Sequence, residues 1–163
     1  MTIPDINLSI NPELARKILT GFITSEITRV GFERAVVGLS GGIDSALSCV
    51  LAAEALGPEN VLAVRMPYKS SSPESLEHAQ MVIDQFGVRS ETIEITDMVD
   101  PLIARDPDMS KVRKGNIMAR ARMIILYDQS EAFKGLVVGT GNKTEILLGY
   151  STLWGDSALS TNH

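Results

Sequence analysis

The chain has 163 residues, of which 44% are hydrophobic and 21% charged, and its formal net charge is −5 at pH 7. This length suits one compact domain with its own core and is short for two, so residues 1–163 are predicted to form a single domain. The acidic balance argues against a general nucleic-acid binder, which needs a basic face, and no window approaches the roughly 20 apolar residues of a membrane span.

The predicted elements alternate between helices and strands from the start of the chain. Asn11 offers an N-cap and Pro12 a first-turn proline, and apolar residues from Leu14 to Ile27 recur at helical spacing. Short apolar runs bounded by turn residues indicate buried strands. The pattern predicts helices over residues 11–30, 43–56, 72–86 and 114–133, and strands over residues 35–39, 61–64, 88–95 and 136–139.

This order of elements indicates the fold class. Strands that alternate with helices favour an open, mainly parallel sheet with helices on both faces and right-handed crossovers, a Rossmann-like α/β fold. Residues 96–113, interrupted by Pro101 and Pro107, are predicted to form a short helix and a mobile loop. Cys49 is the single cysteine, and its apolar helical surroundings predict a buried residue. Because it has no disulfide partner in the chain, a reducing cytoplasm is expected.

The strongest local signal lies between the first predicted strand and the helix after it. The segment reads Gly38-Leu39-Ser40-Gly41-Gly42-Ile43-Asp44-Ser45. A helix N-terminus presents unpaired N–H groups and partial positive charge to a phosphate, and the glycines allow close approach of the backbone. The Ser40 and Ser45 hydroxyls are predicted to add donors. Asp44 would repel phosphate unless a divalent cation such as Mg²⁺ lay between them.

A plainer interpretation of the same segment needs no ligand. Asp44 or Ser45 could serve the start of the helix in an ordinary tight turn. The segment is not a Walker A loop, because no Gly-Lys-Ser/Thr follows at the required spacing, and it lacks the Gly-x-Gly-x-x-Gly dinucleotide pattern.

Residues 40–45, Ser-Gly-Gly-Ile-Asp-Ser, resemble the pyrophosphate loop of the N-type ATP pyrophosphatases. Within that superfamily, two further segments resemble signatures of the NAD synthetases. One is Gly-Thr-Gly-Asn-Lys-Thr-Glu at residues 139–145, followed by Gly-Tyr-Ser-Thr-Leu-Trp-Gly-Asp at residues 149–156. The other is Lys-Gly-Asn-Ile-Met-Ala-Arg-Ala-Arg-Met at residues 114–123. The resemblance implies an adenine nucleotide alpha hydrolase-like fold.

The same resemblance implies roles for individual residues. ATP would be bound by residues 38–45 and Thr140, Mg²⁺ by Asp44 and Glu145, and the dinucleotide substrate by Asn116, Arg120 and Lys143. Thr140 and Glu145 follow a predicted strand, at the sheet edge where ligands of open α/β folds bind. From position alone, Glu145 is better explained as a solvated acid in a first helical turn, and the metal role comes from the resemblance. Lys143 is similarly explained as a surface lysine.

Two pairs of side chains leave alternatives open. Arg120 and Arg122 are two positions apart on a helix and cannot share a face, and the resemblance favours Arg120 as the site residue. Arg122 is then expected at the surface. Tyr150 and Trp154 are explained either by stacking on a base or by filling the core, and the core is favoured.

The reaction implied by the resemblance has two steps. The carboxylate of nicotinic acid adenine dinucleotide attacks the α-phosphorus of ATP and releases pyrophosphate, and ammonia then displaces AMP to give NAD. No residue of the chain need act as a nucleophile. Nothing in the sequence resembles a glutaminase, so the ammonia would be free or delivered by a separate domain or chain. The resemblance also implies a homodimer.

The sequence departs from the NAD synthetase pattern at its C-terminus. Family members continue beyond the motif that ends at Asp156, whereas this chain stops after residues 157–163 and is expected to be truncated. Two other functions therefore stay open. The chain could be another N-type ATP pyrophosphatase, such as a tRNA-modifying or GMP synthetase-like enzyme, or a non-catalytic ATP-binding fragment.

Overall fold

The computed structural model of the chain describes residues 9–155. The elements in chain order are α1 (Pro12–Arg29), β1 (Ala35–Gly38), α2 (Ile43–Leu56), the 3-10 helix η1 (Pro58–Asn60), β2 (Val61–Arg65), α3 (Pro73–Phe86), β3 (Arg89–Thr92), α4 (Thr96–Ile103), α5 (Lys111–Phe133), β4 (Leu136–Val138) and α6 (Lys143–Leu148). The four strands form one parallel sheet in the order β3-β2-β1-β4. This arrangement confirms the predicted α/β fold.

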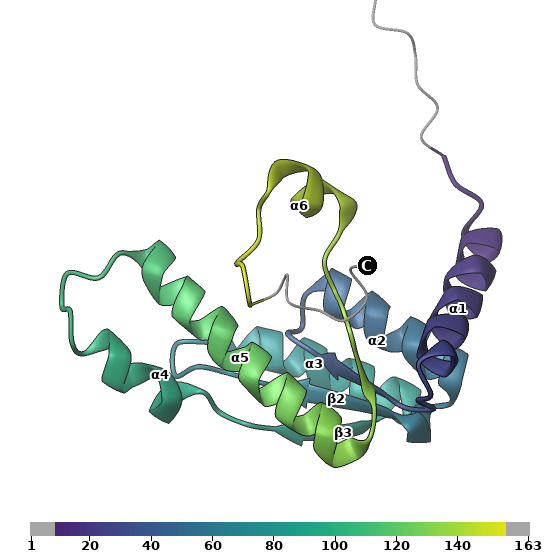
Figure 1. Cartoon of the computed structure of the whole chain (residues 1–163), viewed down its shortest axis with the longest axis horizontal. Coiled ribbons are helices and arrows are strands. Elements are labelled where there is room, and N and C mark those ends of the chain that lie inside the picture. Colours follow the sequence, from purple (N-terminus) through teal and green to yellow (C-terminus); the bar gives the residue numbers. More distant parts are fainter. Residues whose placement is uncertain (1–8, 156–163) are drawn as a thin grey trace, which may run out of the picture.

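Helices cover both faces of the sheet, with α1, α2 and α3 on one side and α4 and α5 on the other (Figure 1). The division follows from the alternation of side chains along each strand. In β1, Val37 points to the first group of helices and Val36 to the second. Because both faces are covered, β1 and β2 are apolar almost throughout, as buried parallel strands are.

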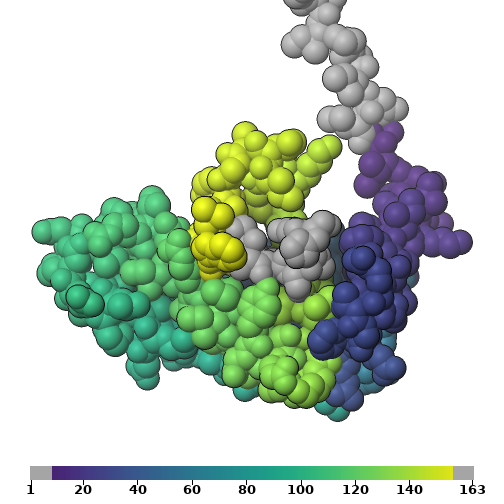
Figure 2. Space-filling model, in the orientation of Figure 1, coloured from purple at the N-terminus to yellow at the C-terminus, as the bar shows by residue number. Residues whose placement is uncertain are grey.

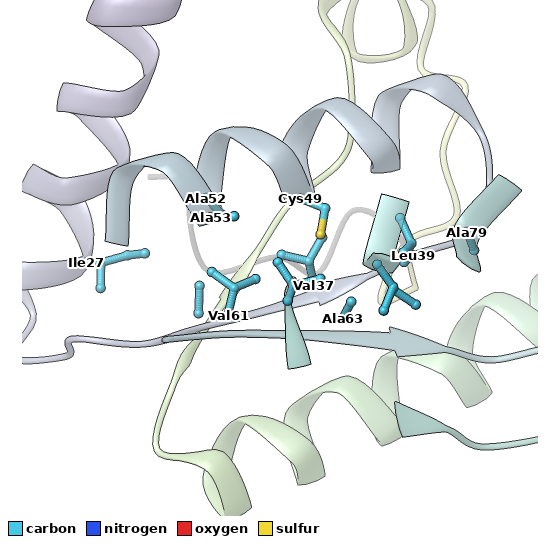
Figure 3. Packing of buried hydrophobic residues seen from close by; sticks show 12 residues of the cluster. Ile27, Val37, Leu39, Cys49, Ala52, Ala53, Val61, Ala63 and Ala79 are labelled. Atoms are coloured by element: carbon cyan, nitrogen blue, oxygen red, sulfur yellow. The ribbon is translucent and has the colours of Figure 1, made fainter. Parts of the chain in front are cut away.

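Small side chains let α2 lie close to the sheet. Cys49 and Ala52 of α2 are fully buried and pack over Val37 and Val61 (Figure 3). Cys49 is thus a core residue, as predicted. Burial raises the pKa of its thiol to about 11, because the apolar surroundings disfavour the thiolate.

Two element boundaries differ from the prediction by three residues, and the others agree to within one residue. The long helix begins at Lys111 instead of residue 114, because the Ser110 hydroxyl accepts the Arg113 N–H at 3.3 Å and forms an N-cap. The strand predicted over residues 88–95 is shortened to Arg89–Thr92. It lies at the edge of the sheet, and its four residues are exposed.

The apolar stripe of α1 is only partly covered. Ile27 is buried and Ile23 packs beside it, whereas Leu14, Ile18 and Phe22 are more than half exposed. The cause is that α1 packs mainly on α2, to which it is also tied by an ion pair and a side-chain hydrogen bond. Among the described residues, no helix is both long and apolar enough to cross a membrane.

The turn between β1 and α2 is held against the start of α3. Gly41 has a φ of +85°, and a Cβ on it would lie 2.0 Å from the carbonyl oxygen of Ser75. A left-handed φ and this close approach both require glycine. The loop and the first turn of α3 are therefore fixed relative to each other by backbone contact.

We expect Gly41→Ala to lower the free energy of unfolding by about 2 kcal/mol or more, since the substitution adds both backbone strain and a clash. Urea unfolding followed by circular dichroism measures this. Gly42→Ala is the matched control: Gly42 has a φ of −78°, and its added Cβ would lie 3.4 Å from the Ser40 Oγ. A change of under about 1 kcal/mol is expected there. Equal effects of the two substitutions would contradict this account of the turn.

We also expect the Cys49 thiol to be inert in the folded protein. With a pKa of about 11, about one thiol in a thousand is a thiolate at pH 8, and the side chain is fully buried. Reaction with a disulfide reagent such as DTNB should be at least about 100-fold slower in buffer than in urea. Rapid labelling of the native protein, with no loss of its circular dichroism signal, would show that the thiol is accessible.

Candidate active site

The loop that follows β1 is shaped by its own hydroxyl groups. Ser45 is 4% exposed; its Oγ accepts the Ser40 N–H at 3.2 Å and donates to the Gly42 carbonyl at 2.9 Å. The Ser40 Oγ accepts the Gly42 N–H at 3.2 Å and lies 3.0 Å from the Ser45 Oγ. These hydroxyls therefore hold the loop in shape, a use that differs from the free donors expected from the sequence. The first turn of α2 has no side-chain cap, so its N–H groups remain available to an anion.

A cavity of about 550 Å³ opens beside this loop, where the carboxyl ends of β1, β2 and β4 meet. It is lined by Gly38, Leu39, Ser40, Arg65, Met66, Pro67, Ser71, Ser72, Ser75, Leu76, Ala119, Arg122, Met123, Leu126, Val138, Thr140 and Gly155. Thr140 thus lies where the sequence predicted, beside the start of the loop. The lining residues that the structure describes include two arginines and no acidic residue. In a chain whose net charge is −5, this distribution gives the cavity a local positive charge, which favours anions.

Arg65 has an incomplete set of hydrogen bonds. Its Nη1 donates to the Gln80 Oε1 at 2.6 Å, while its Nε is buried and has no hydrogen-bond partner among the described residues. A buried donor without an acceptor is costly. The sequence interpretation had no role for Arg65, although a cation at the end of a buried parallel strand was a usable signal.

The two arginines of α5 lie in different surroundings. Arg122 lines the cavity, and its Nε donates to the Met66 carbonyl at 3.0 Å. Burial lowers the pKa of its guanidinium, because a charge loses hydration there. Arg120 is exposed and donates from its Nε to the Leu153 carbonyl at 3.2 Å, outside the cavity lining.

The other predicted substrate residues lie apart from the cavity wall. Asn116 accepts a hydrogen bond from the Thr152 hydroxyl at 2.9 Å, and together with Arg120 it ties residues 152–155 to α5. Gly155 lies so close to α5 that its Cβ would be 3.0 Å from that of Ala119. Lys143 is exposed at the start of α6. Asn116 and Lys143, like Arg120, are absent from the cavity lining.

The predicted metal ligands, Asp44 and Glu145, are both carboxylates in the first turn of a helix. Asp44 is exposed in the first turn of α2. Glu145 forms a capping box with Asn142, in which its Oε2 accepts the Asn142 N–H at 3.0 Å. Within residues 9–155, no cluster of three or more His, Cys, Asp or Glu side chains is placed to hold a metal. Hard oxygen donors nevertheless fit Mg²⁺, if phosphate oxygens complete its coordination.

The prediction that Tyr150 and Trp154 fill the core is wrong. Their exposed fractions are 78% and 72%. Both follow α6, which stands out from the body of the domain (Figure 2). Asp156, which ends the signature at residues 149–156, and residues 157–163 lie outside the described residues.

The loop after β2, which forms one wall of the cavity, is anchored on α4. The Tyr68 hydroxyl donates to Asp100 Oδ1 at 2.7 Å and the Lys69 ammonium to Oδ2 at 2.5 Å. These two donors hold the pKa of the Asp100 carboxyl below its usual range. The wall that includes Met66 is therefore held from α4 as well as from Arg122.

Comparison with known proteins agrees with this geometry. A family model described as NAD synthase matches residues 15–162. A protein of Trichlorobacter lovleyi named NH(3)-dependent NAD(+) synthetase is 56% identical over 155 residues, which are 95% of this chain and 57% of that protein. One of the same name from Chlorobium phaeovibrioides is 53% identical over 96% of this chain and 56% of its own length. The chain thus spans little more than half the length of these curated relatives.

Solved structures share the fold. The NH3-dependent NAD synthetase of Campylobacter jejuni, in complex with nitrate, has a TM-score of 0.87 and 38% identity over 93% of this chain and 66% of its own. The glutamine-dependent NAD+ synthetase of Acinetobacter baumannii, in complex with ADP, has a TM-score of 0.85 and 34% identity over 95% of this chain and 30% of its own. The NMN synthetase of Francisella tularensis has a TM-score of 0.84 and 30% identity over 92% of this chain and 63% of its own. The phosphate loop, the cavity at the carboxyl edge of the sheet and the match over residues 15–162 lead to one conclusion: the chain belongs to the NAD synthase family.

Proposed function

We propose that this chain carries the synthetase chemistry of an enzyme that converts nicotinic acid adenine dinucleotide, ATP and ammonia into NAD, AMP and pyrophosphate. The observation that carries the proposal is the cavity of about 550 Å³. It joins a phosphate loop to two arginines and contains no acid among its lining residues. Such a site suits a nucleoside triphosphate, whose charge is several units negative.

In this proposal the chain acts by alignment and charge stabilisation. The uncapped N–H groups in the first turn of α2, with the N–H of Gly41, would bind the pyrophosphate part of ATP. The N–H groups of Leu39, Ser40 and Gly42 already donate within the protein and hold the loop in shape. The loop is rigid because of the serine network and the contact of Gly41 with Ser75. Holding the substrate carboxylate in line with the α-phosphorus would lower the barrier without any covalent intermediate on the protein.

Asp44 and Glu145 would hold Mg²⁺ in this proposal. The ion would supply positive charge to the phosphate oxygens when bound. Asp44 makes no hydrogen bond or ion pair with a described side chain, so its carboxylate is free for such a role. One oxygen of Glu145 already caps α6, which leaves the other for a cation.

The dinucleotide would reach the cavity over residues 152–155. Arg120, Asn116 and Lys143 would bind it there, as the resemblance implies, if Arg120 exchanged its bond to the Leu153 carbonyl for a ligand phosphate.

Ammonia as the nitrogen source is supported by the names of the curated relatives described above, which call those proteins NH(3)-dependent. A reducing cytoplasm is a proposal supported by the free, buried Cys49 thiol.

The first test incubates the 163-residue chain with ATP, Mg²⁺, nicotinic acid adenine dinucleotide and ammonium, and follows pyrophosphate and NAD. We expect both products, and we expect Asp44→Asn to reduce pyrophosphate formation by about 100-fold or more, since the charge that holds Mg²⁺ is lost. Asp97→Asn, which changes an exposed first-turn acid of α4, is the matched control and should retain the wild-type rate.

Three results would contradict the proposal in different ways. ATP binding without either product would favour a non-catalytic ATP-binding fragment. Pyrophosphate that forms with nicotinic acid mononucleotide in place of the dinucleotide would assign another substrate, that of an NMN synthetase. Absence of ATP binding by the folded chain would remove the role of the loop itself.

We further propose that the chain forms a homodimer, in which the exposed stripe of α1 contributes to the interface. Leu14, Ile18 and Phe22 recur every four residues on one face, with exposed fractions of 56%, 60% and 51%. An apolar stripe of this kind on a surface helix is expected to be covered by a partner. The resemblance to NAD synthetases supports a second copy as that partner.

Sedimentation equilibrium tests the dimer. The wild-type chain should sediment with twice the 17.6 kDa mass of the monomer, and Phe22→Glu should shift the equilibrium toward monomer at least about tenfold, because the charge would be buried in the interface. Met81→Glu, at a residue of α3 that is 64% exposed, should leave the equilibrium unchanged. A wild-type chain that stays monomeric at all concentrations tested would exclude the proposal.

A further inference from the structure

Arg122 lies at the point where the phosphate loop begins. Leu126, one helical turn further along α5, would be 3.3 Å from a Cβ on Gly38, and Met66 is equally close to that position. Because α5 leads through Lys134 and Gly135 directly into β4, it runs opposite to the strands. Arg122 therefore lies further than Leu126 toward the carboxyl edge of the sheet, where the loop turns away from β1.

The guanidinium of Arg122 is only partly satisfied. A guanidinium has five N–H donors, and the hydrogen bond that this one makes within the described structure is from Nε to the Met66 carbonyl at 3.0 Å. No ion pair joins it to a described carboxylate, and within residues 9–155 no acidic residue lines the cavity. A cation that loses hydration without gaining an anion is costly.

We propose that Arg122 contacts the phosphate groups of the nucleotide, with the Met66 carbonyl fixing the Nε edge of its guanidinium and the terminal N–H groups directed to the ligand. The inference rests on the proposed function, which supplies a nucleotide as the occupant of the cavity. A guanidinium suits this task because its planar fork makes paired, charge-assisted hydrogen bonds to phosphate. It gives Arg122, which the sequence interpretation expected at the surface, a binding role in the cavity that it lines, separate from the dinucleotide contact proposed for Arg120.

A purely structural role for the same residue makes a different prediction. If Arg122 only held the Met66 wall in place, its loss would weaken every ligand of the cavity to the same degree, whatever the charge of the ligand. Loss of a phosphate contact instead weakens the ligands that carry the contacted phosphate and leaves the binding of adenosine nearly unchanged. Comparing ATP, AMP and adenosine therefore separates the two roles.

The experiment measures dissociation constants for the three ligands by isothermal titration calorimetry, with Mg²⁺ present, for the wild type, Arg122→Gln and Arg122→Lys. For Arg122→Gln we expect ATP to bind at least about tenfold more weakly, AMP to be affected less, and adenosine to change less than about twofold. Arg122→Lys, which keeps the charge and loses the fork, should fall between the wild type and Arg122→Gln. Arg113→Gln is the matched control on α5, because Arg113 is paired with Asp106 away from the cavity.

Each outcome bears on the assignment. Equal weakening of all three ligands, or no weakening by Arg122→Gln, would overturn the phosphate contact while the proposed function stands. If Arg122→Gln does not fold, Arg122→Lys must bind ATP more weakly than the wild type does while its affinity for adenosine stays the same. Absence of that difference in Arg122→Lys would overturn the contact. A wild-type chain that binds adenosine and ATP equally would also overturn it, and one that binds neither would overturn the proposed function as well.

Discussion

The backbone contact between Gly41 and Ser75 is the constraint on which the cavity depends. The first turn of α3 lies against the β1–α2 loop at a separation that leaves no room for a side chain, with 2.0 Å from the would-be Cβ to the Ser75 oxygen. Residues on either side of this contact line the cavity, Ser40 from the loop and Ser75 and Leu76 from α3. A side chain at position 41 would separate the two segments. The turn between β1 and α2 and the cavity wall are therefore formed by the same packing.

The distribution of charge gives this cavity its chemical character. The chain is acidic as a whole, but Arg65 and Arg122 line its cavity, and no acid does so in the part of the chain that the structure describes. Each arginine uses part of its donor set on a protein acceptor, Gln80 for Arg65 and the Met66 carbonyl for Arg122. These bonds fix the orientation of the guanidinium groups before a ligand binds. Preorganised donors of this kind need little rearrangement when an anion arrives.

Most of the architecture could be predicted from local patterns. Strands of Val, Ala and Leu that alternate with helical segments predicted the parallel sheet, because a segment buried on both faces has to be apolar throughout. The predictions were less accurate where local patterns compete. The N-cap at Ser110 places the start of α5 three residues before the predicted one. Tyr150 and Trp154 were assigned to the core on residue type alone, yet they follow α6 and are exposed, since apolar character does not say which surface a segment packs against.

The sequence by itself determined the family resemblance, the phosphate loop and the position of Thr140, because these depend on consecutive residues at the end of a strand. Only the tertiary structure decided which arginine of α5 enters the cavity. Arg120 and Arg122 are separated by about 200° around the helix, so the choice depends on how α5 is rotated on the sheet. That rotation is set by Ala121, Ile125 and Leu126, which pack on the strands, and it turns Arg122 toward Met66 and Arg120 toward Leu153. The tertiary structure likewise decided that the Ser40 and Ser45 hydroxyls bond to backbone groups of the loop and lie within hydrogen-bond distance of each other. The turn is what brings these groups together.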